Sequence, residues 1–230
     1  MRVSVILPTA GFGTRMNSRK QFLELDGDPI FLYTLRKFAA SDRVTEIVVA
    51  VRPEDRAFVE ETIAGAGIAK TVRVVEGGDT RQQSVENGLA AVDAEAELIA
   101  VHDAVRPFVD HETIARVIDE AAETGAAIVG VVPVDTIKRV TKGTAKIRST
   151  VPREDLVMAQ TPQVVRHELL KRAYAKATAD GFTGTDEASL IEHLEGIEVS
   201  VVAGNERNIK ITRPSDLVLA QFYAGLERDA

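Results

Sequence analysis

The chain of 230 residues contains no cysteine. Disulfides, thiolate metal sites and cysteine nucleophiles are therefore excluded, and the absence fits a reducing compartment. No apolar run approaches the roughly 18 residues that a membrane-spanning helix needs. No signal peptide precedes the first strand-like segment, so we expect a cytoplasmic protein that does not contact a membrane.

The chain also lacks an excess of positive charge, since 28 lysines and arginines face 35 acidic residues and the formal net charge is -7 at pH 7. A nucleic-acid-binding protein usually presents a basic face, so we expect no nucleic-acid partner. Hydrophobic residues make up 45% of the chain and charged residues 27%, which predicts a packed globular core. The length fits one domain, or one domain with an appendage.

Apolar runs of strand length, rich in valine and isoleucine, recur along the chain. They cover residues 3–7, 47–51, 72–75, 98–101, 127–132 and 199–202. Nearly continuous apolar runs are typical of strands buried on both faces of a sheet. Segments with helical spacing lie between them, among them 30–38, 53–63, 114–121 with Asp110 as N-cap, and 214–226. The alternation predicts an α/β fold with a mostly parallel central sheet.

One region breaks this alternation. Two alternating stretches flank Lys142-Gly143-Thr144, which predicts a hairpin with glycine in its turn. A two-stranded arm of this kind has too few partners to be stable alone. We therefore expect a single domain over residues 1–230 in which 134–155 form a protruding β-arm that packs on a second subunit.

The stretch "PTAGFGTRMNSRKQ" at residues 8–21 follows the first strand. Gly11 and Gly13 allow the backbone to approach a phosphate closely, with N–H groups available for bonding. Arg15 and Lys20 add positive charge beside those groups. The pattern is neither a P-loop nor a dinucleotide fingerprint, and it is equally compatible with an ordinary turn followed by a solvated basic loop.

The stretch "HDAVRPF" follows the strand at 98–101. Asp103 at a strand end is suited to hold Mg²⁺ beside a nucleotide phosphate, and Arg106 is suited to grip a phosphate. Alternatively, Asp103 caps a turn and Arg106 is a surface charge. We expect His102 to be structural, because the histidines show no metal-ligand spacing.

Further polar stretches have both a functional and a structural interpretation. In "GGDTRQQSV", Arg81 and Ser84 sit at a helix start that attracts anions, or Asp79 or Thr80 simply caps that helix. Asp186 in "TDEAS" fits a helix cap, and Lys210 in "NIKITRPSD" fits a solvated charge. None of these stretches indicates a function by itself.

Together, however, these stretches occur in one order with "DTIKRV" and "QTPQ". In this combination the chain resembles the 2-C-methyl-D-erythritol 4-phosphate cytidylyltransferases of the non-mevalonate isoprenoid pathway, from Val3 to about Tyr223. The resemblance implies a Rossmann-like nucleotidyltransferase domain and a homodimer with exchanged arms. It also implies that CTP and methylerythritol phosphate react with the help of Mg²⁺, giving CDP-methylerythritol and pyrophosphate.

The resemblance also implies roles for the residues that match the family's motifs. Arg15 and Lys20 would stabilise the transition state, and Asp103 would bind the metal. The nucleotide would be held by Ala10, Gly11, Gly13, Gly78, Arg81 and Ser84. The polyol phosphate would be surrounded by Asp103, Arg106, Thr136, Arg153, Thr161 and Lys210. Thr136 and Arg153 lie on the arm, so we expect them to serve the partner's site.

Other functions remain open at this point. A sister group that acts on ribitol 5-phosphate also has "HDAVRP" with Val105, whereas "TDEAS" and "DTIKRV" favour the methylerythritol enzyme. A non-catalytic nucleotide-binding module on the same fold is a second alternative. A nucleotide-sugar glycosyltransferase is a third, and it usually carries an Asp-x-Asp metal motif, which we do not expect here.

Overall fold

The computed structural model describes residues 1–11 and 19–228. In these ranges seven strands form one sheet in the order β11-β7-β10-β6-β1-β4-β5. The strands are β1 (Val3–Pro8), β4 (Glu46–Val51), β5 (Thr71–Glu76), β6 (Leu98–Val101), β7 (Ala126–Val131), β10 (Met158–Arg166) and β11 (Ser200–Ala203). Among the described pairings of this sheet, those of β10 with β6 and β7 are antiparallel and the others are parallel. The predicted α/β fold with a mostly parallel sheet is confirmed.

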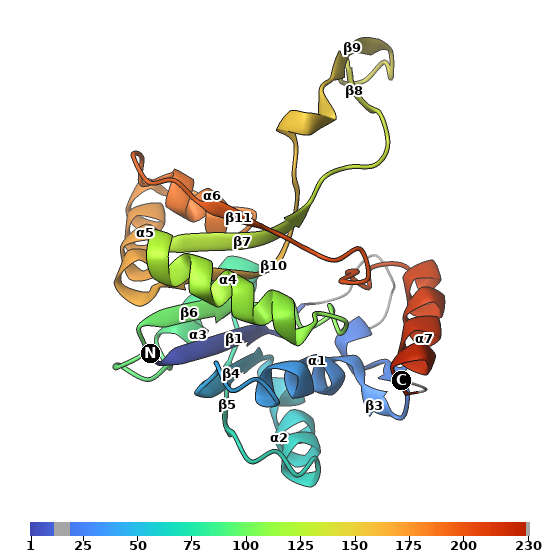
Figure 1. The fold of residues 1–230 in the computed structure, drawn as a ribbon. Coiled ribbons are helices and arrows are strands. Elements are labelled where there is room, and N and C mark those ends of the chain that lie inside the picture. Colours follow the sequence, from blue (N-terminus) through green and yellow to red (C-terminus); the bar gives the residue numbers. More distant parts are fainter. Residues whose placement is uncertain (12–18, 229–230) are drawn as a thin grey trace.

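Helices cover both faces of the sheet (Figure 1). They are α1 (Ile30–Ala39), α2 (Arg56–Gly65), α3 (Arg81–Leu89), α4 (His111–Thr124), α5 (His167–Asp180), α6 (Glu187–Glu192) and α7 (Pro214–Arg228), with 3₁₀ turns η1 (Lys20–Phe22), η2 (Pro53–Asp55) and η3 (Arg153–Asp155). Alternate strand residues face opposite sides. Val5 and Leu7 pack with α1, α2 and α4, whereas Ile6 packs with α3, α5 and α6. Within the described ranges, no helix combines the length and the apolar character that a membrane crossing requires.

Three helices begin with a side chain that caps free backbone N–H groups. Asp110 accepts from the N–H of Thr113 at 2.6 Å at the start of α4, as predicted. Thr80 caps α3, and Asp186 forms a reciprocal capping box with Ser189 on α6. A cap of this kind stabilises a helix by about 1 kcal/mol. The structural interpretations of Thr80 and Asp186 are therefore confirmed.

The sequence did not predict strand β10 or helix α5. The middle of β10 carries the polar residues Gln160, Thr161 and Gln163, all of them buried. Its pairing with β7 is also irregular between Ala159 and Gln163. A polar, interrupted strand lacks the apolar run by which the other strands were recognised, and only its neighbours in the sheet supply the partners that make it stable.

A two-stranded arm projects from the sheet (Figure 1). Strands β8 (Ile137–Val140) and β9 (Ile147–Val151) pair antiparallel, so the predicted hairpin is confirmed. Gly143 in its turn has φ +84°, a conformation that favours glycine. Val140 and Ile147 on the arm are 51% and 68% exposed, so this chain alone leaves the arm's apolar side chains uncovered.

A second, short hairpin supports the C-terminal helix. Strands β2 (Glu24–Leu25) and β3 (Asp28–Pro29) are joined by Asp26 and Gly27, both with positive φ. An Asp-Gly pair is typical of such tight turns. Buried Leu25 and Ile30 pack with Ala220 and Ala224 of α7 and with Val105, which brings the last helix beside the end of β6.

Candidate active site

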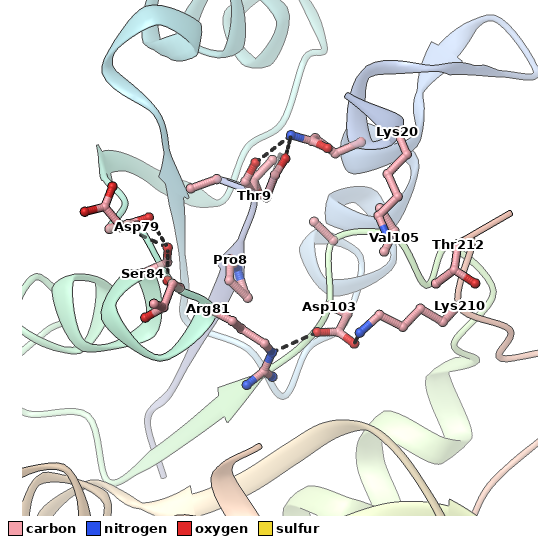
Figure 2. Close-up of a pocket in the computed structure, with 16 residues that line it drawn as sticks. Pro8, Thr9, Lys20, Asp79, Arg81, Ser84, Asp103, Val105, Lys210 and Thr212 are labelled. Atoms are coloured by element: carbon pink, nitrogen blue, oxygen red, sulfur yellow. Dashed lines mark hydrogen bonds and ion pairs between the residues drawn. The ribbon is translucent and has the colours of Figure 1, made fainter. Parts of the chain in front are cut away.

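A cavity of about 270 Å³ lies beyond the ends of β1 and β6 (Figure 2). Ligands of open α/β sheets bind at the carboxyl ends of the strands, so this is the expected position. Five segments that are distant in sequence form its wall. They contribute Pro8, Thr9, Ala10, Gly11, Lys20, Gln21, Gly78, Asp79, Thr80, Arg81, Ser84, Asp103, Ala104, Val105, Lys210 and Thr212.

The first wall is the backbone that follows β1. The N–H of Thr9 donates to the carbonyl of Ala50 at 2.8 Å, which extends the sheet by one residue. Ala10 then passes very close to Gly77, where a Cβ atom would lie 2.6 Å from the Cβ of Ala10. Any side chain at position 77 would push these two loops apart, so the glycine is needed for this close approach.

The second wall is the loop that leads into α3. The hydroxyl of Ser84 accepts from the N–H of Gly78 at 3.1 Å and donates to the carbonyl of Thr80 at 2.8 Å. Ser84 is buried, so these bonds fix the loop against the first turn of the helix. Gly78, Arg81 and Ser84, which the sequence singled out together, all line the cavity.

Asp103 lies at the centre of a cluster of cations. Its carboxylate is 2.7 Å from Nζ of Lys210, 3.1 Å from Nε of Arg81 and 3.7 Å from Nε of Arg106. Burial by itself would raise the pKa of Asp103, but the charges of Arg81, Lys210 and Arg106 outweigh it and hold this pKa well below its usual range. Asp103 is therefore an anion at neutral pH. Lys210 is part of the cavity and not a solvated edge charge.

Arg81 is held from behind by a carboxylate that the sequence analysis did not select. Glu187 on α6 is fully buried and accepts from Nη1 and Nη2 of Arg81 at 2.8 and 2.9 Å. The hydroxyl of Tyr174 lies 3.4 Å from the same carboxylate. Burial opposes the charge of Arg81, but Glu187 and Asp103 raise its pKa overall. Glu187 stands in the quoted stretch "TDEAS", where only its neighbour Asp186 was considered.

A buried polar scaffold lies beneath Asp103. The hydroxyl of Thr161 accepts from the N–H of Asp103 at 3.1 Å and is 3.1 Å from Nδ1 of His102. Nε2 of His102 donates to the carbonyl of Arg106 at 3.0 Å. Burial lowers the pKa of His102 to about 3, so its ring is neutral at neutral pH. The prediction that His102 is structural agrees with these contacts.

Arg106 and Thr161 belong to this scaffold and are not among the described residues that line the cavity. Nη1 of Arg106 donates to the carbonyl of Asn208 at 2.8 Å. The side-chain amide of Asn208 donates to the carbonyl of Thr161 at 2.9 Å. These contacts link the loop of Asp103 to the segment that carries Lys210. Arg106 and Thr161 therefore support the positions of Asp103 and Lys210 without lining the cavity themselves.

Among the remaining predicted residues, Lys20 lines the cavity and the others do not or are not described. Thr136 and Arg153 are exposed on the arm, away from the cavity of their own chain, and the guanidinium of Arg153 donates to the carbonyl of Val134. Gly13 and Arg15 lie outside the described residues. Lys20 lies on the same cavity wall as the loop after β1, and Figure 2 shows its side chain entering the space near Val105 and Lys210.

The residues that the structure describes include no cluster of three or more His, Cys, Asp or Glu suited to a metal ion. Two described carboxylates, Asp79 and Asp103, line the cavity, and Asp103 is the one that pairs with Arg81 and Lys210. The sequence does contain one Asp-x-Asp, contrary to our expectation, at Asp26 and Asp28. These carboxylates pair with Arg228 and Arg36 at the turn of the β2–β3 hairpin and do not line the cavity.

Comparisons with known proteins agree with this geometry. The family model of IspD, described as 2-C-methyl-D-erythritol 4-phosphate cytidylyltransferase, matches residues 3–226. Proteins of that name from Solibacter usitatus and Acidobacterium capsulatum are 57% and 53% identical, each aligned over 97% of this chain and 96% and 97% of their own lengths.

Solved structures extend the comparison to three dimensions. A 2-C-methyl-D-erythritol 4-phosphate cytidylyltransferase from Thermus thermophilus aligns with a TM-score of 0.80 at 36% identity, covering 98% of this chain and 100% of that one. A 4-diphosphocytidyl-2C-methyl-D-erythritol synthase from Anaerococcus prevotii aligns with a TM-score of 0.86 at 29% identity, over 97% and 98% of the two chains.

Proposed function

The chain belongs to the family of 2-C-methyl-D-erythritol 4-phosphate cytidylyltransferases, and on this premise we propose that it transfers the cytidylyl group of CTP to 2-C-methyl-D-erythritol 4-phosphate. The products are CDP-methylerythritol and pyrophosphate, in the synthesis of isoprenoid precursors. One observation carries the proposal: Arg81, Lys210 and ionised Asp103 meet in a cavity beside the backbone that follows β1. Cations and backbone N–H groups around one carboxylate suit a bound triphosphate.

The chemistry explains why such a site needs no general base. The nucleophile is a phosphate oxygen of the acceptor, which is already an anion when it attacks the α-phosphorus of CTP. The barrier comes from bringing anions together and from the charge on a five-coordinate phosphorus. Catalysis is therefore positioning and electrostatic stabilisation, and we assign the stabilising charges to Lys20 and Arg15.

We assign the two substrates to different sides of the cavity. The backbone of Ala10 and Gly11, with Gly78, Arg81 and Ser84, would hold the nucleotide. Lys210 would bind the phosphate of the acceptor, because its side chain lines the cavity. Its Nζ is positioned there by Asp103, at 2.7 Å. Arg106 and Thr161 would support this side through the contacts of the buried scaffold.

Mg²⁺ fits the donor set of this site. In nucleotide sites this ion usually takes one or two carboxylates and completes its shell with substrate phosphates and water. Asp103 offers an ionised carboxylate at the cavity wall, kept in the charged form by Lys210 and Arg81. When bound, the ion would offset negative charge on the phosphate oxygens, and Asp103 would be its protein ligand.

We further propose that the active form is a homodimer in which the arms are exchanged. Thr136 and Arg153 would then complete the acceptor side of the partner's cavity. The exposed apolar residues Val134, Val140 and Ile147 support the idea that a second chain covers the arm. Between positions 136 and 153 the arm also carries six lysines and arginines and no acidic residue, which suits both an acidic partner surface and anionic substrates. A cytoplasmic location completes the proposal and rests on the cysteine-free sequence.

A pyrophosphate-release assay tests the reaction. It crosses CTP, UTP and ATP with methylerythritol phosphate and ribitol 5-phosphate, with and without Mg²⁺. We expect turnover with CTP and methylerythritol phosphate, dependent on the metal. The names of the similar proteins disfavour the ribitol enzyme, and turnover only with ribitol 5-phosphate would reverse that choice. No turnover with any pair would indicate a nucleotide-binding module.

A further inference from the structure

Three successive carbonyl groups beside the cavity are bound by side chains from outside the loop that contains them. The side-chain amide of Gln21 donates to the carbonyl oxygens of Thr9 and Gly11 at 2.9 and 3.1 Å (dashed lines beside Thr9 in Figure 2). Nε of Arg52 donates to the carbonyl oxygen between them, that of Ala10, at 2.9 Å. Every carbonyl from residue 9 to residue 11 therefore has a donor.

The Gln21 amide is held in one orientation. The side chain is 3% exposed, and the next residue, Phe22, packs edge-to-face against Phe31 and Phe58. Turning the amide over would place its oxygen against two carbonyl oxygens, so the NH₂ group must face them. Gln21 is thus a rigid donor and not a mobile surface residue.

These bonds fix the direction of the backbone N–H groups. In a planar trans peptide, the N–H points away from the preceding carbonyl. The bond from Gln21 to the Thr9 carbonyl therefore turns the N–H of Ala10 away from Gln21. In the same way, the bond from Arg52 to the Ala10 carbonyl turns the N–H of Gly11 away from Arg52. A loop whose carbonyls are tied down cannot turn their negative ends toward an anion, whereas its N–H groups keep one direction.

We infer that Gln21 is a positioning residue that holds the backbone of Thr9, Ala10 and Gly11 in the conformation that binds the triphosphate of the nucleotide. The inference rests on the proposed function, since it assigns the nature of the ligand to that site. Arg52 supports the same loop from the other side of the Ala10 carbonyl. Gln21 lines the cavity but acts through the backbone, so its effect is on phosphate affinity and not on recognition of the base.

The test separates the two halves of the nucleotide. Isothermal titration calorimetry measures binding of inorganic tripolyphosphate and of cytidine to the full chain, in the presence of Mg²⁺. Gln21→Met removes both donors without adding charge, and Gln21→Glu replaces the NH₂ group by an oxygen. We expect tripolyphosphate affinity to fall roughly tenfold with Met, since two hydrogen bonds are lost, and further with Glu. Cytidine affinity should change less than about twofold.

Gln82→Glu is the matched control. Gln82 is a glutamine whose amide likewise contacts a backbone carbonyl, that of Phe182, but it is only partly buried and is not a cavity-lining residue among those described. We expect this variant to bind tripolyphosphate like the wild type. An effect equal to that of Gln21→Glu would mean that added negative charge alone explains the loss, and would overturn the inference.

Further outcomes separate the inference from the proposed function. Wild-type chain that binds neither tripolyphosphate nor CTP contradicts the proposed function itself. Wild-type binding that Gln21→Met leaves unchanged overturns only the inference. A parallel loss of cytidine and tripolyphosphate affinity, with a lowered melting temperature, would show that Gln21 merely stabilises the fold. Arg52→Met offers an independent measurement, since it should also reduce tripolyphosphate binding and spare cytidine.

Discussion

Arg81 and Glu187, which are 106 positions apart in the chain, form a two-bond ion pair with N–O distances of 2.8 and 2.9 Å. The guanidinium is planar and presents its donors in a fixed fork, so occupying Nη1 and Nη2 leaves Nε directed at Asp103. The pair therefore connects a buried helix, α6, to the carboxylate of the site. A lysine at position 81 would lack this geometry.

The pair gives the first prediction. Glu187→Gln keeps the shape of the side chain but removes the charge that orients Arg81. Arg81 then loses its fixed position beside Asp103 and is free to turn toward the bound phosphates. We expect kcat/KM to fall roughly tenfold to a hundredfold, as when groups behind a metal ligand are removed. Steady-state kinetics checks this, with Glu192→Gln as the control because Glu192 is exposed on the same helix. Equal activity of the two variants would contradict a role for Glu187.

The second prediction concerns Lys20 on the wall of the cavity. Lys20→Ala should lower turnover roughly 10²-fold or more, the scale of one lost transition-state donor. Lys37→Ala is a suitable control because Lys37 pairs with Glu227 on the surface, outside the cavity. CTP binding by the Lys20 variant should be weakened much less than its turnover. Near-normal turnover would remove Lys20 from the mechanism.

The third prediction tests the exchange of arms. In a dimer with exchanged arms, each site combines the body of one chain with the arm of the other. Arg153→Ala, an arm variant, should raise KM for the acceptor and leave KM for CTP unchanged. Lys20→Ala, a body variant, should lower kcat.

A mixture of these two variants, assayed at an acceptor concentration at which each alone has little activity, supplies the decisive measurement. After unfolding and refolding together, random pairing restores one intact site in half of the dimers, and about a quarter of the wild-type activity should return. No recovery in dimers shown to be mixed would mean that Arg153 serves its own chain or none.

The fourth prediction concerns stability and pH. Burial would raise the pKa of Asp110, but the N–H of Thr113 and the other groups that bond to the carboxylate lower it overall. A carboxyl group whose pKa is lower in the folded than in the unfolded chain stabilises the fold at pH values above its unfolded pKa, near 3.9. This stabilisation is lost as the pH falls below that value and through the folded pKa.

Asp110→Ala should therefore lower the free energy of unfolding at pH 7 by about 1 kcal/mol, the usual value of an N-cap. Asp110→Asn should keep most of the cap and lose less stability than the wild type as the pH falls below about 4. Urea unfolding at several pH values measures both effects. An identical pH dependence in wild type and Asp110→Asn would show that the carboxylate charge is not involved.

Much of the fold follows from local patterns in the sequence. The strands β1, β4, β5, β6, β7 and β11 were predicted from runs of valine and isoleucine. The expected burial on both faces holds for β1, β4, β6 and β7, whereas the edge strands β5 and β11 are partly exposed. The caps Thr80, Asp110 and Asp186 were predictable for a similar reason, since the group that they satisfy lies only three residues away. The hairpin of the arm follows from alternation around Gly143.

The rest depends on contacts between distant parts of the chain. Strand β10 is polar at its centre and becomes a strand only because β6 and β7 bind it on both sides. The role of Glu187 follows from its approach to Arg81, and that of Gln21 from its approach to the carbonyls of Thr9 and Gly11. Sequence spacing carries no information on such pairs.

The sequence by itself thus determined the class of fold, the family and the residues able to carry the chemistry, because composition, periodicity and ordered motifs are properties of neighbouring residues. The tertiary structure alone decided which of those residues meet. It brought Lys210 and Arg81 to Asp103, put Arg106 and Thr161 into the buried scaffold, and left Thr136 and Arg153 outside the cavity of their own chain. The physical reason is that the charge balance around Asp103 depends on distances of a few ångströms between segments that the chain separates by more than a hundred residues, as for Asp103 and Lys210.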